Sequence, residues 1–144
     1  MKQWIIMSVA FSAILWASPV AQAGGHTDSS HKEHTVGPYF ISPKNGETVA
    51  KEFTIKMGIA CMKVQKAGEL TEGTGHHHLI IDGGFVPETK AVIKDAKHMH
   101  FGKGQTETKI TLSPGKHTLT LQFADGYHQS YGKVMSKSIE VIVK

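Results

Sequence analysis

The sequence predicts an all-β protein whose folded domain is an immunoglobulin-like β-sandwich of about six to seven strands. Short segments with alternating apolar and polar residues recur along the chain, and Gly, Pro and Asn turn signals separate them. No segment of ten or more residues carries a convincing helical repeat. Many short strands of this kind fit a two-layer sandwich better than a closed barrel.

The chain divides into three parts. Residues 1–23 have a lysine near the start, an apolar stretch and the small-residue ending Ala21-Gln22-Ala23, which together are typical of a secretory signal peptide. We expect cleavage after Ala23 and export to the periplasm, with no membrane span in the mature form. Residues 24–37 are polar and lack apolar periodicity, so they predict a flexible, histidine-containing tail. Residues 38–144 form the one predicted domain.

Individual strands follow from the period-two pattern. In "EFTIKMGIAC", residues 52–61, every second residue is apolar, which predicts a half-buried strand with Cys61 on its buried side. Residues 79–81 are consecutively apolar, so that strand is expected to be central and covered on both faces. Residues 85–104 form the least regular stretch, and long irregular loops are often functional.

Two further segments complete the predicted sheets. Pro114-Gly115 separates "TKITLS" from "KHTLTLQF", which predicts a β-hairpin, with the alternate apolar residues of its second strand, Leu119, Leu121 and Phe123, pointing inward. The closing "MSKSIEVIVK" alternates in the same way and predicts the last strand.

Composition excludes several classes of function. The net charge is +4 and the lysines are spread along a chain without arginine, which argues against a nucleic-acid partner. Cys61 is the only cysteine, so no intramolecular disulfide can form. The sequence contains no nucleophile elbow, no zincin helix and no phosphate-binding glycine loop in its proper context.

Histidines carry the strongest chemical signal. In "GHHHLIID", strand alternation places His76 and His78 on one face and His77 on the other. His98 and His100 in "KHMHFGKGQ" repeat the spacing of two. If the two pairs converge, they supply three or four imidazole nitrogens, which suit copper, zinc, nickel or iron.

A structural interpretation competes with the metal site. The same histidines are also typical of a hydrogen-bonded network that anchors the long loop, with Asp82 among its partners. His77 is assigned to such a network or to the core. His117 is in phase with the inward residues of its strand, which predicts a satisfied, inward imidazole. His128 lies in a turn, so we expect it to be exposed.

The predicted tail offers a separate site. Cleavage after Ala23 would expose Gly24-Gly25-His26 as the new N-terminus. A histidine in third place lets the terminal amine, two backbone amides and one imidazole surround a metal in a plane, an arrangement that selects Cu(II) or Ni(II). The alternative is a solvated tail without a site.

Three motifs carry a family resemblance. "GHHHLIID", "HMHFGKGQTET" and "LSPGKHTLTLQFAD" resemble the bacterial exported family known as domain of unknown function 4399, over about residues 38–143. The resemblance implies a small all-β periplasmic domain without an established activity. A fainter, fold-level similarity to the periplasmic copper-resistance sandwich proteins adds to the case for copper. The positions that the family motifs single out are His76, His77, His78, Asp82, His98, His100, Phe101, Gly102, Gly104, Gln105, Thr106 and His117.

The leading hypothesis is therefore an exported, non-catalytic domain that binds a metal ion, with copper favoured and zinc or nickel as the other metals. Its expected ligands are His76, His78, His98, His100, His77 and, in the tail, His26. A cell-envelope interaction or structural module is the main alternative. A metal-dependent enzyme with Asp82 or Glu107 as the base is the third.

Overall fold

The computed structural model describes residues 36–144, and every regular element there is a strand except one turn of 3₁₀ helix. The predicted signal peptide, most of the predicted tail and His26 lie outside these residues. Six strands are five residues or longer, in line with the expected six to seven, and three are shorter. The elements are β1 (Gly37–Ser42), β2 (Glu47–Val49), β3 (Glu52–Ala60), β4 (Lys63–Val64), β5 (Thr74–Ile81), β6 (His98–His100), β7 (Glu107–Thr111), β8 (Gly115–Ala124), η1 (Lys133–Met135) and β9 (Ser136–Val143).

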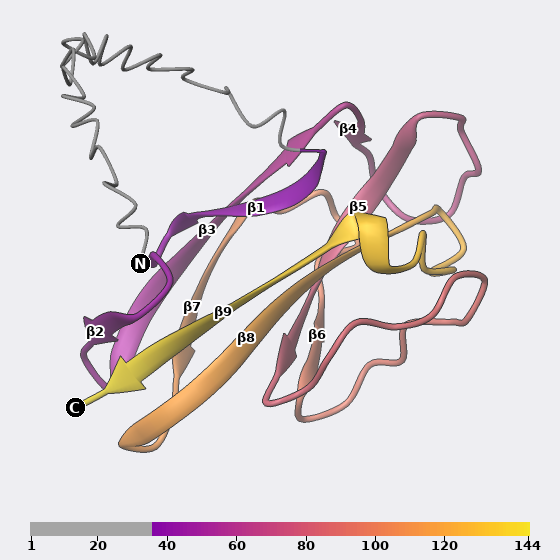
Figure 1. Ribbon diagram of the computed structural model, residues 1–144. Coiled ribbons are helices and arrows are strands. Elements are labelled where there is room, and N and C mark those ends of the chain that lie inside the picture. The colour runs from indigo at the N-terminus through magenta and orange to yellow at the C-terminus, as the bar shows by residue number, and fades with distance from the viewer. Residues whose placement is uncertain (1–35) are drawn as a thin grey trace, which may run out of the picture. The chain divides into compact units, whose positions relative to one another are not determined.

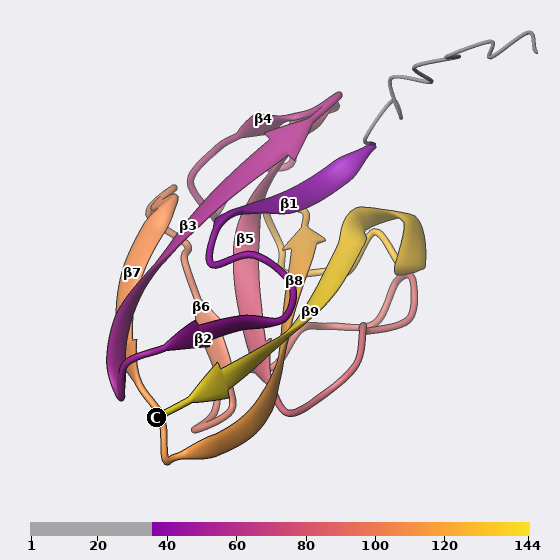
Figure 2. The same cartoon turned by 60° about the vertical axis from the view of Figure 1, so that its left-hand side comes forward.

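The strands of residues 36–144 form two sheets that pack as a sandwich (Figures 1 and 2). One sheet has the order β1-β3-β7, and its pairings are antiparallel. The other has the order β2-β9-β8-β5-β4, and β6 also pairs with β5. The all-β immunoglobulin-like class is therefore confirmed.

The core lies between the two sheets and is built from alternate residues of each strand. Ile55 and Met57 of β3 are buried against the odd-numbered residues of β5 and β8. The inward prediction for Leu119, Leu121 and Phe123 is confirmed, because all three are 0% exposed. Alternation at period two thus gave the inner face of this sheet correctly.

The predicted hairpin at Pro114-Gly115 is wrong. Strand β7 pairs with β3, placing Ile110 opposite Phe53, whereas β8 pairs with β9 and β5 in the other sheet. The connection therefore crosses between sheets. A Pro-Gly turn between two alternating segments is compatible with both outcomes, because each strand has one apolar face that either sheet can bury.

Cys61 also differs from its prediction. Strand β3 ends at Ala60, and Cys61 has a φ of 68°, a left-handed conformation that breaks the alternation. Its side chain is exposed instead of joining the buried face of the strand.

The outer face of β5 and β8 is covered as well, which confirms that β5 is buried on both sides. Gln122 of β8, fully buried, accepts a hydrogen bond from the backbone N–H of Val86 at 3.0 Å. Its amide nitrogen donates to the carbonyl oxygens of Gly132 and Met135. The segments 82–97 and 125–135 are thereby fixed across the outer face, and Ala91 and Gln129 form a β-bridge between them (Figure 1).

Candidate metal centre

Strand β5 distributes its three consecutive histidines over two faces. His77 lies opposite Phe123 and points into the core between the sheets. His76 and His78 lie opposite Ala124 and Gln122, on the outer face that the two segments cover. All three histidines are 0% exposed. The alternation predicted for this run is what the structure has.

Strand β6 adds a third imidazole to the outer face. It pairs antiparallel with β5, with His100 opposite His78 and Met99 opposite Leu79. Met99 packs against the core, so His100 points outward like His78. The ring centroids of His78 and His100 are 5.1 Å apart.

The fourth imidazole comes from the turn after β8. His128 has a φ of 69°, and its N–H donates to the carbonyl oxygen of Asp125. The Asp125 carboxylate accepts the N–H groups of Tyr127 and Gln129 at 2.8 and 2.9 Å, which fixes the turn. The His128 carbonyl accepts the N–H of Val92, so the loop also binds the neighbouring segment.

These side chains, His76, His78, His100 and His128, form what we call the four-histidine cluster. The Nε2 atoms of His76 and His78 are 3.0 Å apart, as are those of His100 and His128. Potential ligand atoms of His76, His100 and His128 lie within 4.8 Å of one another. Metal–nitrogen bonds of about 2.0–2.1 Å require a separation of roughly 3–4 Å, which small ring rotations supply.

Burial lowers the pKa of three of the cluster histidines. Desolvation, helped by the neighbouring His100 and His128, lowers the pKa of His76 from 6.5 to about 4. Desolvation and the other cluster histidines lower the pKa of His78 to about 2. Burial, together with the nearby His128 and Lys94, lowers the pKa of His100. At neutral pH the imidazoles of His76, His78 and His100 are therefore neutral, which is the form that binds metal.

The cluster leaves hydrogen-bonding capacity unused. The Nδ1 atoms of His76 and His78 are buried without a partner, and so are both ring nitrogens of His77. Buried polar atoms in folded proteins are normally paired. Four unpaired nitrogens on consecutive residues therefore call for an explanation beyond ordinary packing.

Gly102 makes room for His100. A methyl group added at Gly102 would lie 2.3 Å from Nε2 of His100, closer than any van der Waals contact allows. The imidazole thus rests directly on the backbone of Gly102, and only glycine permits this approach. This is a physical reason for the glycine in the "HFG" part of the motif.

Several predicted site residues lie outside the cluster. His98 shares a strand face with His100, but its Nδ1 atom bonds the Asp95 carboxylate at 2.8 Å. His77 packs edge-on against Phe123 in the core. Glu107 pairs with Lys56 at the surface. No described contact brings these three side chains to the other imidazoles.

His117 is satisfied, as the sequence predicts. Its Nδ1 atom is 2.9 Å from the Asp82 carboxylate, and its Nε2 atom is 2.9 Å from the carbonyl oxygen of Ser113. The hydrogen bond that His117 donates to the Asp82 carboxylate raises the pKa of His117. Asp82 also accepts the N–H of Thr118 and is thereby engaged in holding the β7–β8 crossover.

His128 is the ligand candidate that the sequence interpretation missed, because a turn histidine was expected to be exposed. It is half-buried, and its Nε2 atom faces His100. Its distance in sequence from the other histidines follows no ligand spacing. The only available signal was the turn-forming Asp125-Gly126, which shows a turn but not its contact.

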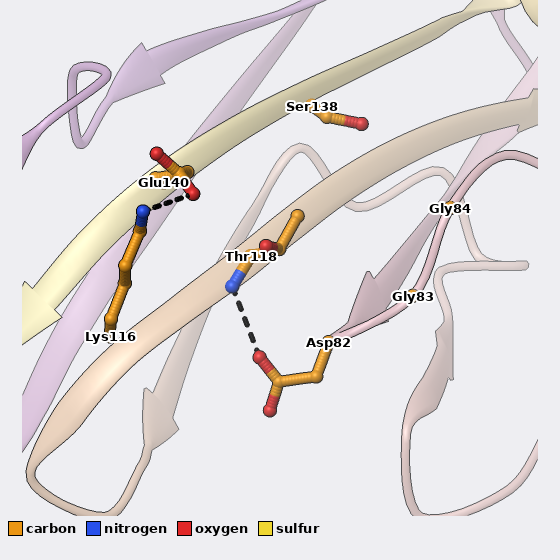
Figure 3. Close-up of a pocket in the computed structure, with 7 residues that line it drawn as sticks. All are labelled: Asp82, Gly83, Gly84, Lys116, Thr118, Ser138 and Glu140. Atoms are coloured by element: carbon orange, nitrogen blue, oxygen red, sulfur yellow. Dashed lines mark hydrogen bonds and ion pairs between the residues drawn. The ribbon is translucent and has the colours of Figure 1, made fainter.

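A shallow hollow of about 540 Å³ lies away from the cluster, at the other end of the same outer face (Figure 3). Its polar groups already bind one another. Lys116 pairs with Glu140 at 2.7 Å, Asp82 accepts from Thr118, and Thr120 bonds Ser138 and Gly83. The chemistry therefore concentrates at the histidines.

Residues 55–144 match the model of the family described as Domain of unknown function (DUF4399). The matched residues include all four cluster histidines. The chain belongs to this family. No curated protein matches the chain. Among solved structures, the fibronectin(III)-like modules of Clostridium thermocellum CbhA are similar at 12% identity and a TM-score of 0.44, over 74% of this chain and 96% of that one. No helix in the described part of this DUF4399 protein is long and apolar enough to cross a membrane.

Proposed function

We propose that this protein is an exported domain that binds one transition-metal ion at its four-histidine cluster, with copper as the preferred metal. The observation that carries the proposal is convergence: imidazoles from β5, β6 and the turn after β8 meet at one point. Within residues 36–144, the group of potential ligands at that point consists of histidines alone.

The unpaired nitrogens favour a metal site over a hydrogen-bonded network. A network of structural histidines satisfies its ring nitrogens with carboxylates, hydroxyls or carbonyls, as His117 does with Asp82 and Ser113. In the cluster, His76 and His78 bond only each other's Nε2 atom and leave both Nδ1 atoms unpaired. Because the two rings bond only each other, a cation that binds their Nε2 atoms would displace no other hydrogen-bond partner.

The donor atoms guide the choice of metal. Imidazole nitrogen suits copper, zinc and nickel, and among divalent ions such a site binds Cu(II) most tightly. Residues 1–23 have the composition of a secretory signal. In an exported protein we favour copper or zinc as the bound metal. The Gly24-Gly25-His26 sequence would add a separate Cu(II) or Ni(II) site if the signal is removed after Ala23.

The test is a calorimetric titration of residues 24–144 with Cu(II) and Zn(II). After dialysis, elemental analysis then measures the metal that stays bound. We expect one equivalent to remain with the domain when His26 is replaced by alanine, and that equivalent to be lost in the double variant His76→Ala/His100→Ala. A blank titration combined with a lowered Tm in the double variant would instead assign the histidines a structural role in a cell-envelope module.

A further inference from the structure

We infer that His78 is a fourth metal ligand, which closes the coordination sphere and makes the centre a holding site with no open position for water. This inference rests on the proposed metal binding and specifies its ligand number. The group of closest ligand atoms contains only His76, His100 and His128, so a three-histidine centre with one open position is the alternative. Three histidines plus water is the arrangement of catalytic zinc sites.

The position of His78 favours the closed centre. Its Nε2 atom is 3.0 Å from that of His76, close to the roughly 3.3 Å that separates two nitrogens on a tetrahedral ion with bonds of about 2.05 Å. Its ring centroid lies 5.1 Å from His100 and 6.0 Å from His128. His128 is on a half-buried turn, so the adjustment falls on one of the two residues of the cluster that are not fully buried.

Counting unpaired nitrogens gives the same answer. Without metal, His76 and His78 share one hydrogen bond, and two Nδ1 atoms lack partners. If a metal bound His76 Nε2 but not His78, the His78 Nε2 atom would lose its hydrogen-bond partner. A third buried nitrogen would then be unpaired. If His78 also coordinates, the count stays at two. Each ring then keeps its single proton on Nδ1, so coordination requires only a change of tautomer.

Access to the ion follows from burial. His76 and His78 are fully buried beneath the covering segments, while His100 and His128 are half-buried. Any open coordination position would therefore have to face the His100 and His128 side. With His78 bound as well, all four positions of a tetrahedral ion are taken by protein nitrogens.

The experiment uses Co(II) as the probe in residues 24–144 carrying His26→Ala, because its visible absorption reports coordination number. His78→Gln is compared with His77→Gln, an equally buried substitution on the opposite face of the same strand. We expect the parent chain and His77→Gln to give the intense spectrum of a four-coordinate ion that millimolar azide leaves unchanged. His78→Gln should bind Co(II) at least about tenfold more weakly, with a spectrum that azide shifts.

Two outcomes of the cobalt experiment would overturn the inference. An azide-sensitive spectrum in the parent chain would show an open position, and an unchanged spectrum in His78→Gln would show that this residue is not a ligand. If Co(II), Zn(II) and Cu(II) all fail to bind, the proposed function itself fails. Should His78→Gln not fold, X-ray absorption of the zinc-loaded parent chain decides directly, because scattering from the outer ring atoms counts the coordinated imidazoles: four support the inference, and three contradict it.

Discussion

The Nε2 atoms of His100 and His128 lie 3.0 Å apart, although one residue belongs to β6 and the other to the turn after β8. His98 is two residues from His100 on the same strand face, yet it bonds Asp95 instead. Proximity in sequence therefore does not identify the partner of His100. The turn that Asp125 fixes brings His128 to His100 instead.

This relationship predicts that one histidine substitution weakens metal binding and that another leaves it unchanged. His128→Gln should weaken Cu(II) or Zn(II) binding by at least about tenfold, because it removes one of the converging imidazoles. His98→Gln should leave the affinity unchanged within about twofold, since the His98 ring is held by Asp95 outside the cluster. Competition titrations against a chromophoric chelator measure both. A larger loss for His98→Gln than for His128→Gln would contradict the assignment of ligands.

The sequence predicts the parts of this site that depend on local periodicity. Strand alternation correctly separates His76 and His78 from His77, and it places the apolar residues of β8 inward. It cannot predict that Ser113 to Gly115 cross between sheets, because both sheets offer an apolar face. It also cannot place His128, whose contact depends on how two loops pack over the outer face. Long-range packing of loops leaves no periodic trace in the sequence.

Gly102 provides a test of cluster geometry that leaves every histidine in place. Gly102→Ala should fold, because the atoms that the new methyl group meets first belong to the His100 ring, which can rotate away. The displaced ring should lower metal affinity by about tenfold or more. Gly84→Ala is the matched control, since no heavy atom lies within 4 Å of its added methyl group.

The two variants are compared by circular dichroism and metal titration. Equal Tm values with unequal affinities would confirm that Gly102 acts through the position of His100. Equal affinities would show that the imidazole tolerates displacement, and the close approach would then have no bearing on metal binding.

Acid should destabilise the metal-free domain. In the unfolded chain a histidine titrates near 6.5, whereas burial lowers the pKa of His76 and of His77 to about 4 in the folded state. Between these values the unfolded chain binds more protons, so stability is complete above pH 6.5 and is lost as pH falls towards 4. The loss per group is about 1.4 kcal/mol for each pH unit in this window. Urea unfolding at pH 7, 6, 5 and 4 measures it.

His77 allows its own share of this acid sensitivity to be removed. The ring is buried beside Phe123 with both nitrogens unpaired, and desolvation is the cause of its lowered pKa. His77→Leu should therefore raise the free energy of unfolding at pH 7 by about 1–2 kcal/mol and flatten the acid dependence, with metal affinity unchanged. A destabilised variant would show that these nitrogens have partners essential to the fold.

The Asp82–His117 pair should give the opposite pH dependence. Its hydrogen bond raises the pKa of His117 above 6.5, so the folded chain binds more protons than the unfolded chain in the window above that value. The contribution is complete below pH 6.5 and is lost as pH rises through the folded-state pKa. Asp82→Asn removes the charge that His117 faces at 2.9 Å.

We expect Asp82→Asn to lower the free energy of unfolding by about 1–2 kcal/mol at pH 6, with a smaller loss at pH 8.5. The Asp82 side chain is 40% exposed, which places the effect below that of a buried charged pair. Asp95→Asn is the control, because Asp95 bonds His98 in a similar way but its side-chain hydrogen bonds go to Lys97 and His98 and not to the crossover. Because Asp82 and His117 join the end of β5 to the start of β8, an equal loss in both variants would mean that the pair does not hold the crossover between the sheets.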